Sequence, residues 1–188
     1  MAVIKSKANK KTVYNPKYLF MTPWVDGVKG ETIYQLEEVV RDSTSVTQED
    51  PEENPIDNEF SSEPIINTIN PGSYTFAANV GDMQAELLMA LAGFDTTTEG
   101  LAIAPDGYKE IFVEVALVFE AGGKNVAAIL PKVQLNSKAL LESINTSIGQ
   151  ISIAGTGYSG PVYAKGVAVE GKMAPFYMDY DYTLPTEE

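Results

Sequence analysis

A ten-residue apolar run followed by a glycine turn constrains the fold of this chain more than any other feature. The sequence at 111–120 is Ile-Phe-Val-Glu-Val-Ala-Leu-Val-Phe-Glu, in which β-branched and aromatic residues dominate. Such residues favour strands. The turn sequence Ala-Gly-Gly-Lys-Asn follows at 121–125, and a second apolar run occupies 126–130. The pattern therefore predicts a β-hairpin.

Further strands are predicted on both sides of this hairpin. Residues 148–154 alternate with a period of two, and other apolar or β-branched stretches are bounded by Gly, Pro or Asn. The turn Asn70-Pro71-Gly72 predicts that the strands on either side of it form a hairpin. The segment 133–145 fits either a strand or a short helix capped by Ser137. The remaining strands are expected at 18–24, 31–41, 65–69, 73–77, 162–170 and 176–182.

One helix is predicted, over residues 82–92. Asp82 fits an N-cap and Gly93 the residue that ends the helix, and nearly all residues between them are strong helix formers. Leu87, Leu91 and Phe94 recur at helical spacing, which indicates a face turned to the core. The fold class expected is mainly β (α+β), a sandwich or barrel-like arrangement of sheets with this helix packed against it.

The most polar segment, residues 42–63, is predicted to be a long acidic loop. Its composition cannot bury enough apolar surface to pack, and loops of about 20 residues tend to be functional. A solvated insertion and a calcium site are both considered, although the spacing and glycine of an EF-hand are missing. The acidic residues of the loop are Glu49, Asp50, Glu52, Glu53, Asp57 and Glu59.

Charge divides the chain into a basic N-terminal arm, residues 1–17, and a single acidic domain, residues 18–188. The arm holds five lysines and no acid, a net charge of +5, whereas the remainder has a net charge of −18. No basic residue lies between Arg41 and Lys109. So acidic a surface should repel nucleic acid. The arm is expected to be a solvated tail or to become ordered on a partner.

The residue types that are missing exclude several kinds of chemistry. The chain has no cysteine and no histidine, so disulfides, thiolate and imidazole metal sites and imidazole-based catalysis are excluded. No cofactor is expected. The N-terminus lacks the apolar run of a signal peptide, and no stretch approaches the roughly 20 apolar residues needed to span a bilayer. We therefore expect synthesis in the cytoplasm.

Two glycine motifs are weak matches to nucleotide-binding patterns. Residues 166–172, Gly-Val-Ala-Val-Glu-Gly-Lys, follow a P-loop until Met173 stands where Ser or Thr must reach Mg²⁺. Residues 155–160, Gly-Thr-Gly-Tyr-Ser-Gly, precede a strand rather than a helix. A turn and a strand are expected at both places.

The order of elements resembles the major tail tube proteins of tailed bacteriophages, a fold shared with contractile injection tubes. The resemblance covers about residues 25–182, and three features carry it. The acidic loop ends Asn58-Glu-Phe-Ser-Ser-Glu-Pro-Ile65, a strand pair follows through Pro71-Gly72, and Val80-Gly-Asp-Met-Gln-Ala-Glu-Leu-Leu-Met-Ala-Leu-Ala-Gly93 precedes the long hairpin. The motifs are loose, because architecture more than invariant residues unites the family.

The resemblance implies a structural subunit with no catalytic residue. Such subunits form rings, typically hexamers, that stack into a tube through which DNA passes without specific binding. The implied location is the virion tail, assembled in the host cytoplasm and not in a membrane, with the tape measure, tail terminator and distal tail proteins as further partners. The early loop and the N-terminal arm commonly contact the adjacent ring in this family. The inter-subunit or inter-ring candidates are Lys5, Lys7, Lys10, Lys11, Glu49, Asp50, Glu52, Glu53, Asp57 and Glu59.

Other functions stay open at this point. A β-sandwich that binds a glycan or a partner protein would use exposed aromatic residues, with Trp24 or the group Tyr177, Tyr180 and Tyr182 as candidates. A hydrolase with two carboxylates is a further alternative, although no spacing singles out such a pair. Another virion structural protein is the last.

Overall fold

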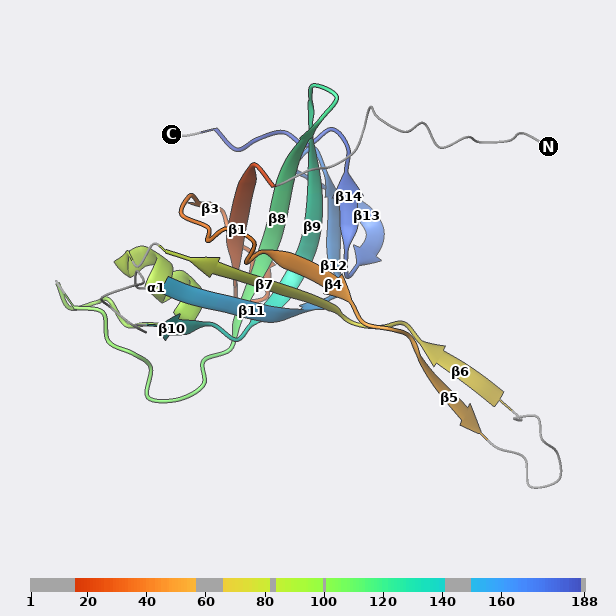
Figure 1. Ribbon diagram of the computed structural model, residues 1–188, viewed down its shortest axis with the longest axis horizontal. Coiled ribbons are helices and arrows are strands. Elements are labelled where there is room, and N and C mark those ends of the chain that lie inside the picture. The colour runs from red at the N-terminus through yellow and green to blue at the C-terminus, as the bar shows by residue number, and fades with distance from the viewer. Residues whose placement is uncertain (1–15, 57–65, 82–83, 100, 141–149, 187–188) are drawn as a thin grey trace.

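The computed structural model describes residues 16–56, 66–81, 84–99, 101–140 and 150–186 (Figure 1). The fold is mainly β with one helix and a large antiparallel sheet, which confirms the predicted fold class. At its centre lies the predicted hairpin, formed by β8 (Ile111–Ala121) and β9 (Lys124–Leu135). Gly122 and Gly123 form its turn with φ values of 63° and 78°, a conformation that glycine adopts without strain.

The central hairpin belongs to a sheet of ten strands. The strand order is β2-β1-β8-β9-β11-β7-β4, while β3 pairs with β1, β10 with β11, and β14 with β9. All the pairs are antiparallel. The bounds of these strands are β1 Tyr18–Val25, β2 Val28–Lys29, β3 Tyr34–Leu36, β4 Ser45–Gln48, β7 Tyr74–Val80, β10 Lys138–Leu140, β11 Gln150–Tyr158 and β14 Tyr177–Asp179.

Residues 34–40 join the two ends of this sheet. Strand β3 pairs with β1, and immediately afterwards Val39 forms a bridge with Val80 at the end of β7. The Val40 N–H donates to the Asn79 carbonyl at 2.8 Å, and the Gly81 N–H donates to the Glu38 carbonyl at 2.7 Å. The segment therefore links β1 to β7, and the sheet curls into a barrel-like layer pair.

The main core lies between the two halves of this curled sheet. In Figure 1 the strands β1, β8 and β9 run across the direction of β7 and β11, as in sheets that pack orthogonally. Buried side chains from both halves meet between them, among them Met21, Phe76, Leu130 and Ile153. A second cluster around Phe20 and Ile129 covers the opposite face of β1, β8 and β9.

The one helix among the described residues, α1 (Ala85–Ala92), packs against this main core through Leu87, Leu88 and Leu91. Its apolar face and its end at Gly93 confirm the prediction from spacing. The helix begins at Ala85 with Gln84 at the N-cap position. Asp82, the predicted N-cap, lies outside the described residues.

The prediction of a long loop over 42–63 is wrong for much of its length. Strand β4 occupies Ser45–Gln48 and β5 occupies Glu52–Ile56. Low apolar content excludes burial in a core, but it does not prevent backbone pairing in an exposed strand. Acidic composition was therefore a poor guide to hydrogen bonding here. The rest of the predicted loop, from residue 57, lies outside the described residues.

The hairpin predicted through Asn70-Pro71-Gly72 is also wrong. Strands β6 (Ile66–Asn70) and β7 do not pair with each other; β6 pairs with β5, and β7 pairs with β4. Ser45 faces Ala77 and Gln48 faces Tyr74, and in the same register Glu52 faces Asn70 and Ile56 faces Ile66. Residues 45–56 and 66–77 thus form one two-stranded ribbon that Pro51 and Pro71 interrupt without shifting. We call it the acidic ribbon.

Smaller differences occur elsewhere in the chain. The strand predicted over 162–170 is broken by a turn at Lys165-Gly166, so β12 (Gly160–Ala164) and β13 (Val167–Ala174) form a separate two-stranded sheet. The strand predicted over 31–41 is reduced to β3 and the bridge at Val39. The described part of 133–145 contains strand and no helix. Both glycine motifs lie in strands and turns, as expected.

Substitution of Gly72 tests the junction between the acidic ribbon and the barrel. A Cβ added at Gly72 would overlap the carbonyl oxygen of Glu49 on the opposite strand. We expect Gly72→Ala to lower the free energy of unfolding by about 1–3 kcal/mol, the usual cost of forcing extra volume into a packed site. Gly107→Ala, with open space around the added methyl group, is the control in urea denaturation. Equal stability of the two variants would contradict the close approach at Gly72.

Candidate functional site

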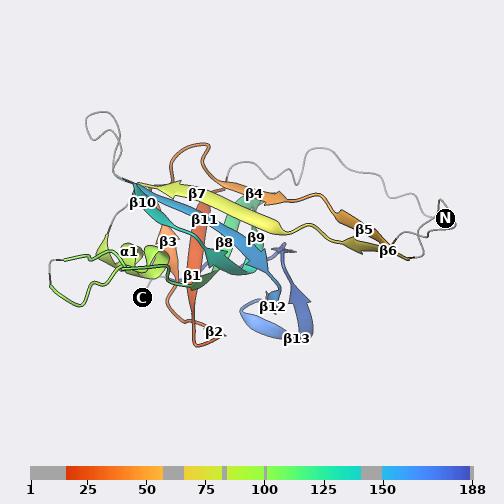
Figure 2. The same ribbon diagram turned by 90° about the horizontal axis from the view of Figure 1, so that it is seen from below.

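The acidic ribbon places four of the predicted site residues on one projecting element. Its outer part, β5 and β6, extends away from the barrel in both views (Figures 1 and 2). Glu49, Asp50, Glu52 and Glu53 are all exposed. Asp57 and Glu59, like Lys5, Lys7, Lys10 and Lys11, lie outside the described residues. At about 3.3 Å per residue, a strand from 45 to 56 reaches roughly 40 Å.

Negative charge is concentrated on this ribbon. Within the described residues no ion pair reaches Glu49, Asp50 or Glu52, and Glu49 accepts a hydrogen bond from the Ser73 hydroxyl. Side chains alternate between the faces of a strand, so the adjacent Glu52 and Glu53 place charge on both faces of the ribbon. The ribbon is therefore suited to contact a basic surface.

The outer part of the ribbon has open strand edges. Strands β5 and β6 pair only with each other among the strands that the structure describes. A two-stranded hairpin by itself is marginally stable, and open edges offer backbone groups for pairing with another chain. Both properties are typical of an element that is completed by a partner.

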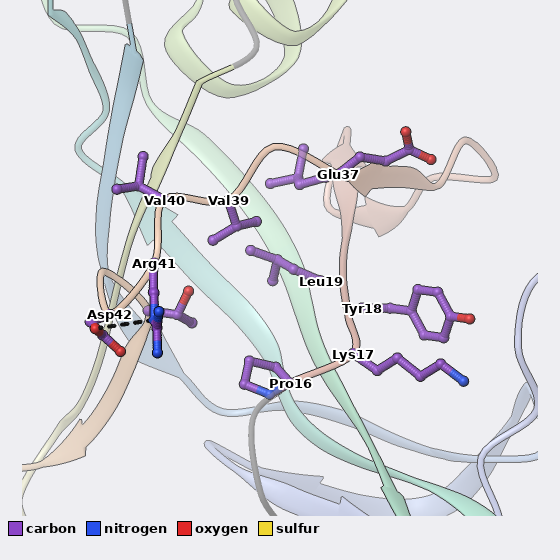
Figure 3. A pocket seen from close by; sticks show the side chains of 11 residues that line it. Pro16, Lys17, Tyr18, Leu19, Glu37, Val39, Val40, Arg41 and Asp42 are labelled. Atoms are coloured by element: carbon purple, nitrogen blue, oxygen red, sulfur yellow. Dashed lines mark ion pairs between the residues drawn. The ribbon is translucent and has the colours of Figure 1, made fainter. Parts of the chain in front are cut away.

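A shallow hollow lies where the N-terminal segment meets the barrel (Figure 3). Its apolar lining includes Leu19, Leu36 and Val39, and its rim carries Lys17, Glu37, Arg41 and Asp42. Arg41 and Asp42 form an exposed ion pair at 3.7 Å. The hollow therefore has charged rim residues around a small apolar floor.

The aromatic residues considered for glycan binding do not form one exposed surface. The Trp24 indole N–H donates to the Pro131 carbonyl at 3.0 Å, and the Lys132 ammonium lies 5.5 Å from the centre of the Trp24 ring. Tyr177 and Tyr182 pack against the second core cluster, whereas Tyr180 is exposed. The tyrosine group therefore contributes mainly to packing, in line with the usual role of aromatic residues in strands.

The sequence analysis missed a buried ion pair beneath the C-terminal strands. Glu114 lies at a bulge in β8 and is only 6% exposed. Its Oε1 accepts a hydrogen bond from the Lys29 ammonium at 2.7 Å, whereas Oε2 has no partner among the described residues. The Lys29 ammonium also lies 4.7 Å from the centre of the Tyr163 ring. The sequence did contain a signal for this pair, because Glu114 is the one charged residue in the apolar run 111–119.

Burial dominates the electrostatics of this pair. It raises the pKa of Glu114 above its ordinary value, although the Lys29 charge and hydrogen bond act in the opposite direction. Burial and the nearby Glu114 charge also raise the pKa of Tyr182 to about 12 and raise that of Tyr177. The Tyr163 N–H donates to the Tyr177 hydroxyl at 3.2 Å. Tyrosines from the C-terminal segment therefore cover the ion pair, and we assign it a structural role.

No group of three or more acidic side chains in the part of the chain that the structure describes is arranged to hold a metal ion. No helix within the described residues is both long enough and apolar enough to cross a membrane.

No protein-family model matches the chain, and no curated protein matches it either. The functional proposal therefore depends on the acidic ribbon and on the part of the resemblance that the structure leaves intact, a helix followed by a long hairpin.

Substitution of Glu114 should change the pH dependence of stability in a defined direction. Because the folded state raises the Glu114 pKa, the protonated acid is favoured there. Its stabilising contribution is full below the unfolded pKa of about 4.5 and is lost as pH rises through the folded pKa. Glutamine is neutral throughout. The melting temperature of Glu114→Gln relative to wild type should therefore increase between pH 4 and pH 7.

Thermal unfolding of both proteins across this range provides the measurement. Glu99→Gln, at an exposed position, is the matched control for the loss of one carboxylate, and the result for Glu114→Gln is compared with it. A Glu114→Gln difference that is constant or falls as pH rises would show that burial does not dominate at Glu114.

Proposed function

We propose that this protein is a structural subunit of a phage-type tail tube and not an enzyme. In this proposal copies of the chain assemble into rings, typically hexamers, that stack into a conduit for DNA. The other tail proteins implied by the resemblance, tape measure, terminator and distal tail protein, would contact the ends or the inside of that tube. Assembly in the host cytoplasm and a final place in the virion tail are parts of the same proposal.

The observation that carries the proposal is the projecting acidic ribbon. Its strands keep one register over the whole length from the barrel to Ile56 and Ile66, so the ribbon is a defined element. Its outer strands have no further strand beside them in the described structure. An exposed two-stranded ribbon is marginal without a partner, and a second copy of the same chain would supply one.

Charge indicates how copies can meet despite a net charge of −13 per chain. Like charges on two acidic ribbons would repel each other, so the ribbon of one copy must contact a different surface of the next copy. The five lysines of residues 1–17 provide one basic candidate within the same chain. Contacts between two different patches are heterologous, and such contacts close into rings or continue into open-ended filaments. A tube of stacked rings would contain both kinds of contact: one that closes each ring and one that continues from ring to ring.

The low density of positive charge agrees with a conduit for DNA. Tight binding of DNA depends on cations that replace phosphate counterions. A lumen lined by an acidic protein would offer few such cations, and DNA could slide without being held.

Negative-stain electron microscopy of the concentrated purified protein tests the proposal directly. We expect rings or tubes, together with a sedimentation profile dominated by assemblies. Dispersed monomers at high concentration would overturn the tail-tube proposal and would favour a monomeric module that binds a glycan or a protein.

Charge reversal of the arm tests its role in stacking. Replacing Lys5, Lys7, Lys10 and Lys11 with glutamate should weaken ring stacking and reduce its sensitivity to salt, because the attraction to the acidic ribbon becomes a repulsion. The matched control replaces the same four lysines with arginine, which preserves the charge. Tube length and abundance, measured by microscopy over a range of salt concentrations, should be close to wild type for the arginine variant. Unchanged assembly of the glutamate variant would refute the contact.

A further inference from the structure

Strand β13 has an amphipathic sequence but no apolar cover. Val167 and Val169 occupy positions of the same parity, as in a strand with one buried face, and Met173 follows an irregularity of the strand around Gly171, where φ is 67°. Yet their side chains are 70%, 37% and 61% exposed. The residues of opposite parity between 168 and 172 are exposed as well. The apolar side chains of Val167, Val169 and Met173 are therefore left exposed by the described residues.

Its partner strand β12 holds β13 out from the barrel. Gly160 at the start of β12 is buried beside Pro131 and Lys132 of β9. Further along β12, the Tyr163 N–H donates to the Tyr177 hydroxyl, and the Lys29 ammonium contacts the Tyr163 ring. β12 is thus fixed against the barrel. The other edge of β13 pairs with no strand among the described residues.

The β12–β13 sheet differs in charge from the rest of the domain. Residues 160–174 contain Lys165, Lys172 and only one acid, Glu170, which gives a net charge of +1 in a strongly acidic chain. Lys165 lies 3.7 Å from Asp181 in an exposed ion pair. No ion pair reaches Lys172 within the described residues. The strand thus combines an open edge and exposed apolar side chains with one base, Lys172, and one acid, Glu170.

The acidic ribbon has the complementary properties. Residues 45–56 carry four acids and no base, a net charge of −4, and their outer part has an open edge. Figures 1 and 2 both place β13 apart from β5 and β6 of the same chain. In this arrangement a contact between the two elements would join two copies.

We propose that β13 is the docking surface for the acidic ribbon of a second copy of this chain. The inference deepens the proposed function and rests on it, because it names where the ribbon binds. Pairing along the open edges would supply backbone hydrogen bonds, as in recognition by strand addition. Packing on Val167, Val169 and Met173 would remove apolar surface from water. Lys172 would lie among Glu49, Asp50 and Glu52 of the neighbouring copy.

A charge-swap experiment tests the electrostatic part of this contact. Lys172→Glu should raise the protein concentration needed for assembly about two- to fivefold, the factor expected for loss of an exposed ion pair. Adding Glu52→Lys in the same chain should restore assembly, since each contact again joins opposite charges. The matched control combines Lys172→Glu with Glu99→Lys, which changes the net charge equally at an exposed position outside both elements. Rescue by Glu99→Lys to the same extent would overturn the specific contact.

Disulfide trapping tests whether the acidic ribbon lies against β13. Because the chain has no cysteine, only the introduced thiols can form a disulfide. A mixture of Val169→Cys and Glu52→Cys proteins should form a covalent dimer upon oxidation under assembly conditions. Ala168→Cys, on the opposite face of β13, is the control for Val169→Cys and should cross-link several-fold less.

The outcomes separate this inference from the proposed function. If wild-type protein forms rings or tubes but neither the swap nor the cross-link behaves as expected, the docking surface is wrong and the tail-tube proposal stands. If wild-type protein forms no assembly at any concentration tested, both proposals fail. Assembly with rescue by Glu52→Lys and a cross-link confined to the Val169 face would establish the contact.

Discussion

The double backbone pairing of residues 34–40 determines which strand edges this protein leaves open. The segment pairs first with β1 and then, through Val39 and Val40, with β7. The two ends of the main sheet are thereby joined, and the large apolar side chains between its halves are shielded from water. Strands β10 and β14 occupy further edges of β11 and β9. The strands β2, β3, β10 and β14 also have a single partner each but are two or three residues long, so the longest open edges among the described residues are those of the acidic ribbon and of β13.

This distribution of edges limits how copies can associate. A strand-rich protein with an open central sheet would aggregate by unspecific edge pairing. In the proposed contact the −4 of residues 45–56 would make ribbon-to-ribbon association unfavourable, whereas Lys172 of β13 would offer the ribbon an opposite charge. Specificity would then come from charge, and affinity from backbone pairing and apolar burial.

Much of the fold could be predicted from the sequence where apolar pattern and burial coincide. The hairpin of β8 and β9 and the strand β1 follow from their apolar, β-branched and aromatic runs, and the helix with Leu87 and Leu91 follows from its spacing, because burial in the core requires apolar side chains at these positions. The acidic ribbon could not be predicted in this way, since backbone pairing in an exposed strand requires no hydrophobic pattern in the sequence. Pro71-Gly72 resembled a reversal of the chain, yet it only interrupts a continuing strand. Local turn chemistry cannot distinguish these two cases, because the difference depends on the register with residues 45–56. The pair Glu114 and Lys29 was missed since its members are 85 residues apart.

The continuation of β6 into β7 in one register has a mechanical consequence. β7 is shared between the acidic ribbon and the barrel: its first half pairs with β4, and its full length pairs with β11 in the core. A load applied at the ribbon would therefore act in shear along several backbone hydrogen bonds at once, rather than peeling them one after another. An element anchored in this way can transmit tension from one molecule to the next without unravelling its own domain.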